Sequence, residues 1–128
     1  MKKKNIQNQK LVDQYAERLI KIIKLDKYNK INLLYKKIFE TWKKGKTIYL
    51  CGNGGSAGNA NHIANDLIFA AGKKNKRGIK AESLASNPSI ITCLANDIGY
   101  ENIFSEQIKV KGTKGDLLIA LSGSGNSK

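Results

Sequence analysis

The sequence predicts an α/β protein with a parallel β-sheet, and three observations support this fold class. The chain has 128 residues, enough for one small domain with one hydrophobic core. Short apolar runs at 47–52, 79–85 and 117–122 have the composition of buried strands. Segments with helical patterns separate these runs, and strands that alternate with helices indicate βαβ units whose strands run parallel.

Residues 1–45 are predicted to form an N-terminal helical segment. Apolar side chains recur at helical spacing from Val12 to Ile23, and the spacing resumes from Ile31 to Trp42. The polar stretch between them leaves two alternatives, two helices or one long bent helix, and Gly45 is suited to end the segment. We expect the apolar stripes to pack against the core or another subunit.

Residues 46–128 are predicted to alternate strands and helices. The first strand leads through a glycine-rich bend into a helix that runs to about Phe69, with Ser56 as its N-cap. A polar loop is expected at 72–78, after which the second strand begins.

The second strand leads into a helix that Pro88 is suited to begin. A further helix is predicted at 100–108 and a turn at 112–116. The last strand, at 117–122, has the most strongly apolar composition, and we expect it to be buried.

The net charge of +13 is concentrated in the N-terminal segment. Residues 1–46 hold 14 Lys and Arg against four Asp and Glu, whereas residues 47–128 hold nine against six. A basic arm of this kind can bind nucleic acid or an acidic partner. The lysines are spread along the helices and are not clustered with aromatic residues into a stacking surface, so a solvated helix surface is the favoured interpretation and a nucleic-acid partner is not expected.

The composition is typical of a globular protein of the cytoplasm. No apolar run approaches the roughly 20 residues that span a bilayer, and no apolar region follows the basic N-terminus as in a secretory signal. Cys51 and Cys93 each lie in an apolar segment. We expect buried thiols and no disulfide.

Glycine and serine follow two of the predicted strands at the carboxyl ends, which right-handed crossovers place at one edge of the sheet. Ser122, Ser124 and Ser127 alternate with small residues in "SGSGNSK", which either cradles a phosphate or is a flexible end. The bend "GNGGS" at 52–56 lacks the lysine of a Walker loop and fits no dinucleotide fingerprint.

His62, the only histidine, lies four residues before Asp66, so both side chains lie on one helical face. This spacing can supply two ligands to zinc, orient an acid–base pair, or form a local hydrogen bond only. Two protein ligands do not complete a zinc site.

Three segments in order, "CGNGGSAGNANHIANDL", "CLANDIGYENIFSEQI" and "LLIALSGSGNS", resemble the phosphoheptose isomerase branch of the sugar isomerase (SIS) domain family. The resemblance covers about residues 45–128. It implies a three-layer fold with a parallel sheet flanked by helices, assembly as a homotetramer, and conversion of sedoheptulose 7-phosphate to a heptose 7-phosphate. Such products enter lipopolysaccharide, capsule or S-layer sugars.

The resemblance also implies roles for individual residues. His62 and Asp66 would bind zinc, which would polarise the substrate carbonyl, and Asp66 would act as the catalytic base. Ser56 would lie close to the sugar. The residues implied to bind the phosphorylated substrate are Asn53, Gly54, Gly55, Asp66, Asn96, Asp97, Ser122, Gly123, Ser124 and Ser127.

The chain departs from the family pattern in two places. Asp66 stands where the family usually has a glutamate, which moves the carboxylate by about 1 Å. The chain also ends at Lys128, before the later strand and helices that carry a glutamine and a histidine of the site, so we expect an incomplete chain. A non-catalytic SIS protein that associates with the replication initiator DnaA is the alternative function, and direct DNA binding is a third.

Overall fold

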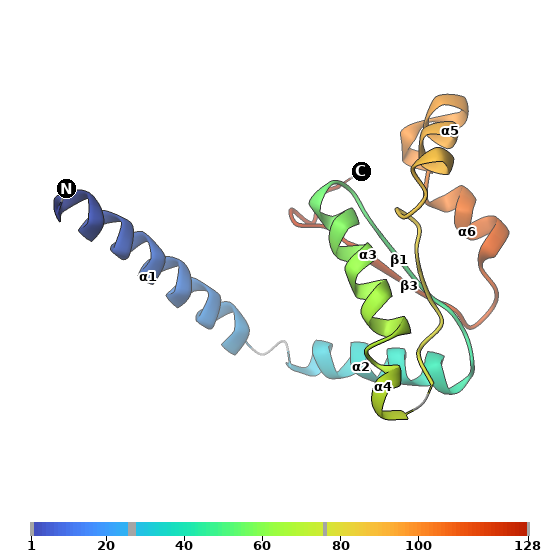
Figure 1. The fold of residues 1–128 in the computed structure, drawn as a ribbon, viewed down its shortest axis with the longest axis horizontal. Helices are drawn as coiled ribbons and strands as arrows, with labels where there is room; N and C mark the ends of the chain where they lie inside the picture. Colours follow the sequence, from blue (N-terminus) through green and yellow to red (C-terminus); the bar gives the residue numbers. More distant parts are fainter. Residues whose placement is uncertain (1, 26–27, 76, 128) are drawn as a thin grey trace. The chain divides into compact units, whose positions relative to one another are not determined.

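A computed structural model of the chain describes residues 2–25, 28–75 and 77–127 (Figure 1). The chain divides into two compact units, Met1–Lys36 and Lys37–Lys128. The boundary that the sequence suggests, between residues 45 and 46, stays a prediction.

Two helices occupy the N-terminal region. The helix α1 (Lys2–Lys24) lies in the first unit, and α2 (Tyr28–Lys43) begins in the first unit and ends in the second. Many of the apolar side chains of α1 are exposed, including Leu11, Val12, Tyr15, Leu19, Ile22 and Ile23.

Gly45 ends α2 as predicted, because it adopts a φ of 65° that other residues avoid. Its amide donates to the carbonyl of Trp42, and the amide of Lys46 donates to the carbonyl of Thr41. These two bonds form a Schellman cap, which satisfies carbonyls that the last helical turn leaves free.

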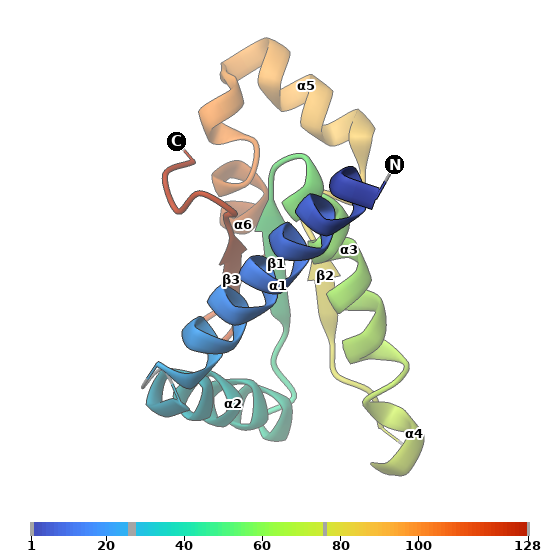
Figure 2. The same ribbon diagram turned by 90° about the vertical axis from the view of Figure 1, so that its left-hand side faces the viewer.

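The sheet of the second unit is parallel and has the order β2–β1–β3, with β1 (Ile48–Gly52) in the centre (Figure 2). Ile48 is paired with Ala81 of β2 (Ala81–Ser83) and with Leu117 of β3 (Leu117–Leu121). The α/β class and the parallel pairing are therefore confirmed.

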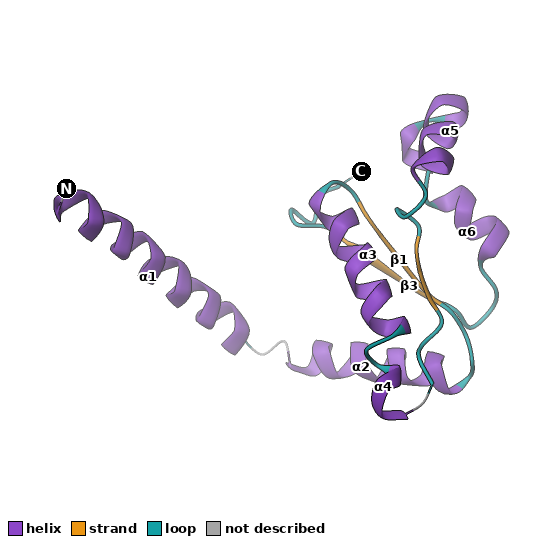
Figure 3. Cartoon of the chain, in the orientation of Figure 1, coloured by secondary structure: helices purple, strands orange, loops and turns teal. Residues whose placement is uncertain are grey.

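Alternate side chains of β1 face two different helical layers. Ile48 and Leu50 pack with Ala60 and Ala64 of α3 (Gly55–Ile68) on one face. On the other face, Tyr49 and Cys51 pack with Leu84 and with two residues of the segment that forms α6 (Ser105–Lys111). Figure 3 shows the strands between these helices. The predicted three-layer arrangement is confirmed.

Three local predictions about α3 and the following segment need correction. Ser56 does not cap α3, because Gly54 is the N-cap and no side chain bonds there. The expected loop at 72–78 contains a short helix, α4 (Gly72–Asn75). The second strand is shorter than the predicted 79–85, because the amide of Ile79 donates to Leu67 of α3 instead of entering the sheet.

The helix α5 (Pro88–Ile98) begins at Pro88 as predicted, and Asn87 caps it by accepting from the amides of Ser89 and Ile90. The predicted helix at 100–108 is instead a 3₁₀ turn, η1 (Tyr100–Asn102), followed by α6.

Two burial predictions are wrong. Along β3 the exposure alternates, so that Leu118 is 50% exposed, because β3 is an edge strand in the described sheet and α6 packs over β1. Cys93 is exposed, because α5 has no buried residue, whereas Cys51 is buried as expected. Both thiols are free. Within the described ranges, no helix is both long and apolar enough to cross a bilayer.

Candidate ligand cavity at the carboxyl edge of the sheet

The turn between β1 and α3 is built around two glycines. A side chain at Gly52 would place its Cβ 2.7 Å from the Cβ of Ser56, so only glycine fits there. Gly54 has a φ of 54° and a ψ of −121°, a conformation that L-residues avoid. The amide of Ser56 donates to the carbonyl of Asn53 at 3.0 Å and closes the turn. The chain therefore enters α3 directly above the end of β1.

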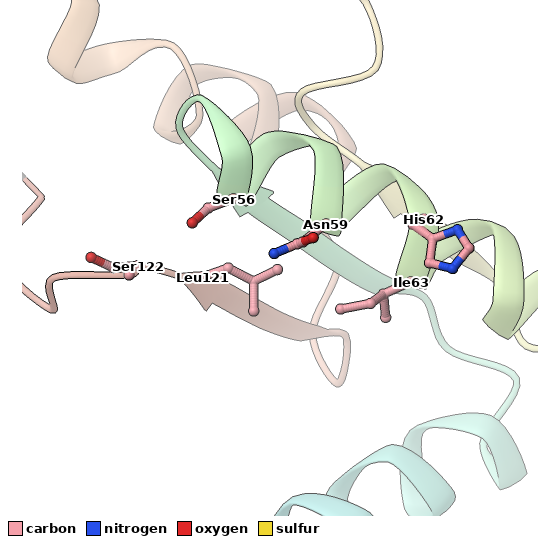
Figure 4. A pocket seen from close by; sticks show the side chains of 7 residues that line it. Ser56, Asn59, His62, Ile63, Leu121 and Ser122 are labelled. Atoms are coloured by element: carbon pink, nitrogen blue, oxygen red, sulfur yellow. The ribbon is translucent and has the colours of Figure 1, made fainter. Parts of the chain in front are cut away.

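A cavity of about 300 Å³ lies between α3 and the end of β3 (Figure 4). Gly52 pairs with Leu121, so the two strands end side by side and the cavity opens at their carboxyl edge. Side chains from both elements, with hydroxyl, amide and imidazole groups among them, line it: Ser56, Asn59, His62, Ile63, Leu121 and Ser122, together with Gly123.

The spacing of residues on α3 places one polar face on this cavity. Ser56, Asn59 and Ile63 are three and four residues apart and lie on one side of the helix. Ala60 and Ala64 are buried against the sheet. The sequence reasoning missed Asn59, Ile63 and Leu121 as cavity residues, although the helical spacing from Ser56 was sufficient to identify the first two.

The serine loop closes on itself through its hydroxyl groups. Ser122 Oγ accepts from the amide of Gly125 at 2.9 Å and lies 3.0 Å from Ser127 Oγ. Ser124 Oγ accepts from the amide of Asn126 at 3.1 Å. Only Ser122 and Gly123 of this loop line the cavity. A bound anion would compete for these hydroxyl groups, which are good phosphate ligands.

His62 and Asp66 lie together on α3, with Nε2 and Oδ2 3.5 Å apart. This separation suits two ligands of one tetrahedral zinc ion, whose donor atoms lie about 3.3 Å apart. Their side chains are 76% and 56% exposed, and Asp66 does not line the cavity. Among the described residues no group of three or more His, Cys, Asp and Glu gathers here, so a metal ion held by His62 and Asp66 would need further ligands.

Asn96 and Asp97 lie near the end of α5 and do not line the cavity. Asn96 Nδ2 donates to Asp97 Oδ1 at 2.8 Å, and Cys93 Sγ donates to Asp97 Oδ2 at 3.6 Å. The hydrogen bond from Cys93 to Asp97 and the negative charge of Asp97 raise the pKa of the Cys93 thiol. Asp97 is therefore an acceptor with two neighbouring donors.

Asn53, Gly54 and Gly55 also lie outside the cavity lining, at the turn above β1. The hydroxyl of Tyr100 donates to Asn53 Oδ1 at 3.1 Å and links this turn to η1. Sequence reasoning did not single out Tyr100, because no spacing rule connects it to Asn53.

The fold and the cavity define a class: an α/β protein with a candidate ligand cavity outside the carboxyl ends of a parallel sheet. The chain belongs to the SIS domain family, which it matches over residues 13–128. The match begins within α1, so the family similarity includes the N-terminal helices.

Individual relatives are similar over the same region. The phosphoheptose isomerase of Aliarcobacter butzleri is 46% identical over 88 residues, 69% of this chain and 46% of that protein. That of Clostridium acetobutylicum is 38% identical over 109 residues, 84% of this chain and 55% of that protein. The chain spans about half the length of these curated relatives.

The solved structure of phosphoheptose isomerase GmhA from Neisseria gonorrhoeae superimposes with a TM-score of 0.81 at 27% identity. The superposition covers 94% of this chain and 63% of that one. A phosphoheptose isomerase from Francisella tularensis gives a TM-score of 0.80.

Proposed function

We propose that the protein is a sugar-phosphate aldose–ketose isomerase that converts sedoheptulose 7-phosphate to D-glycero-D-manno-heptose 7-phosphate. The observation that carries the proposal is the cavity that joins Ser122 to the His62 face of α3 at the carboxyl edge of the sheet, with hydroxyl, amide and imidazole groups in its lining. Relatives that bear the name phosphoheptose isomerase support the same substrate class.

In this proposal the serine loop holds the phosphate. Ser122 and Gly123 already line the cavity, and Ser124 and Ser127 follow within the same loop. The hydroxyl groups would exchange their mutual hydrogen bonds for stronger ones to a charged ligand. The sugar would extend from this loop towards the polar face of α3, where the amide of Asn59 lies.

Groups outside the cavity lining would hold the rest of the sugar. Asn53, Gly54 and Gly55 lie at the turn above β1, and Asn96 and Asp97 lie on α5, which the Tyr100 bond links to that turn. Polar side chains and exposed backbone of this kind suit sugar hydroxyl groups.

Asp66 is the proposed catalytic base, which takes the carbon-bound proton as the carbonyl moves between adjacent carbons. It lies on the same helical face as His62, outside the cavity lining. This role therefore requires a substrate whose reacting carbons extend past Ile63. The aspartate is shorter than the usual glutamate, so the distance from its carboxylate to the reacting carbon is important for this role.

We also propose that His62 and Asp66 supply two ligands to a zinc ion, with the remaining ligands outside the described residues. Zinc, when bound, polarises a carbonyl oxygen. The support within this chain is the 3.5 Å separation of Nε2 and Oδ2.

A homo-oligomer, most simply a tetramer, is proposed for assembly. The exposed apolar side chains of α1 support it, because stripes of this size seldom remain in water. A cytoplasmic location and a role in surface polysaccharide synthesis go with the proposed activity, and a phosphorylated sugar is the expected partner.

The test is turnover of sedoheptulose 7-phosphate by the full-length gene product with zinc added. We expect isomerisation that His62→Ala abolishes and that Asn65→Ala, an exposed change on the same helix, leaves intact. Absence of turnover with this and several other ketose phosphates would overturn the proposal.

The non-catalytic scaffold is the second candidate, and the half-site formed by His62 and Asp66 is the observation that favours it. It predicts co-purification with a replication initiator and no affinity for sugar phosphates. Direct DNA binding predicts an affinity that falls steeply with salt. Affinity for sugar phosphates, without co-purification with a replication initiator and without salt-dependent DNA binding, would exclude both alternatives.

A further inference from the structure

The segment formed by α5 and η1 has few attachments to the rest of the second unit. No residue of α5 is buried, and Ile98 near its end is 46% exposed. Gly99, with a φ of 97°, turns the chain from α5 into η1. The position of this segment therefore depends on contacts at its ends, since packing along its length is slight.

One hydrogen bond connects this segment to the turn above β1. Tyr100 Oη donates to Asn53 Oδ1 at 3.1 Å. In the described part of the chain, every other hydrogen bond of residues 88–102 stays within residues 87–105. The Tyr100–Asn53 bond is thus the one hydrogen bond, in the described part of the chain, that connects the turn to this segment.

The same bond fixes which way the Asn53 amide faces. Oδ1 is occupied by the tyrosine hydroxyl, while Nδ2 has no hydrogen-bond partner among the described residues. The backbone of Asn53 is already held by the bond from the Ser56 amide to its carbonyl. With backbone and Oδ1 both fixed, Nδ2 is presented as a donor.

We propose that Tyr100 is a positioning residue that orients Asn53 so that its amide donates to an oxygen of the phosphorylated sugar. The inference rests on the proposed isomerase function and adds to it a residue that touches Asn53. Tyr100 also ties Asn96 and Asp97, one turn earlier on α5, to the turn that carries Asn53. Two groups of proposed substrate contacts are therefore held together by one hydroxyl group.

A purely structural role for Tyr100 predicts different behaviour. The Tyr100 side chain is largely exposed, so removal of its hydroxyl group leaves no buried partner unsatisfied. A positioning role predicts a loss of substrate affinity with little loss of stability, whereas an anchoring role predicts the reverse.

The first test is Tyr100→Phe in the full-length gene product. We expect KM for sedoheptulose 7-phosphate to rise about fivefold, the effect of one hydrogen bond, with kcat changed less than about twofold. Tyr49→Phe is the matched control, because it removes a tyrosine hydrogen bond of 2.9 Å to the Lys111 carbonyl in the other layer. That control should leave KM unchanged.

The deciding test is a double-mutant cycle with Asn53→Ala, read as KM and as the Kd for sedoheptulose 7-phosphate by calorimetry. If Tyr100 acts through Asn53, Tyr100→Phe has no further effect once Asn53 is alanine. Independent effects that multiply would overturn the inference while the isomerase function stands. A wild-type protein that neither turns over nor binds this sugar would overturn the proposed function and, with it, the inference.

Discussion

The carboxylate of Asp116, just before β3, accepts a hydrogen bond from the backbone amide of Thr47, just before β1, at 2.9 Å. Its second oxygen accepts from the amide and the hydroxyl of Thr113 at 2.8 and 2.9 Å. Burial opposes ionisation of Asp116, but these hydrogen bonds outweigh it and hold the pKa of Asp116 below its ordinary value. The ionised carboxylate thus joins the starts of two adjacent strands.

Replacement of Asp116 should therefore destabilise the fold in a pH-dependent way. Asp116→Ala is expected to lower the free energy of unfolding by about 1–3 kcal/mol at pH 7, because it leaves backbone donors unpaired. Since the folded pKa is lowered, the carboxylate stabilises the fold above its ordinary pKa of about 3.9, and this contribution is lost as the pH falls through the folded pKa. Urea denaturation between pH 7 and pH 3 measures it. Asp116→Asn should reduce the fall in the free energy of unfolding between pH 7 and pH 3. An unchanged dependence on pH in this variant would contradict the prediction.

Two glycines near the site should respond in opposite directions to the same substitution. Gly54→Ala should destabilise the protein by about 1–3 kcal/mol, because its φ of 54° with ψ of −121° is strained for any L-residue. Gly58→Ala, inside α3 with open space around its Cβ position, should stabilise by up to about 1 kcal/mol. Thermal unfolding of both variants checks this contrast. Equal effects would mean that the β1–α3 turn relaxes easily.

The proposed zinc half-site predicts that metal affinity depends on both ligands. His62→Ala and Asp66→Ala should each weaken zinc binding by more than about tenfold, since even changes outside the ligands cost that much. Asn61→Ala, next to His62 but not implied in metal binding, is the matched control. Calorimetric titration of the metal-free full-length protein with zinc measures the affinity without reference to turnover. Retained affinity in both variants would place the metal elsewhere.

The serine loop predicts a phosphate-dependent loss of binding. Ser122→Ala and Ser124→Ala should each weaken the binding of sedoheptulose 7-phosphate by about 1 kcal/mol or more, from loss of a hydrogen bond to a charged group. Binding of the unphosphorylated sugar should not change. Ser89→Ala, at the exposed start of α5, serves as the control. Equal losses for both sugars would argue against phosphate at this loop.

Much of the fold followed from local chemistry in the sequence. Apolar composition identified the strands, and Pro88 and Gly45 marked helix ends because their backbone preferences hold in any context. The prediction of Ser56 as the N-cap was wrong because the bend needs a backbone conformation that glycine at position 54 supplies, so the helix begins two residues earlier than predicted.

Long-range contacts were beyond sequence reasoning. The exposure of Cys93 and of Leu118 depends on which neighbours cover α5 and β3, which the apolar composition of a segment does not reveal. Helical spacing correctly predicted that His62 and Asp66 lie side by side. It did not reveal that His62 lines the cavity whereas Asp66 does not. Ser122 meets α3 only because β1 and β3 end in register.

The two alanines beneath α3 control how wide the site can be. Ala60 and Ala64 are buried against Ile48 and Leu50, and their small side chains allow the helix axis to run close to the sheet. A larger residue at Ala60 would displace the helix away from the sheet and so widen the gap between α3 and β3. The distance between the polar face of α3 and the serine loop thus depends on two methyl groups that lie outside the cavity, so the width of the cavity can change without any change in the residues that line it.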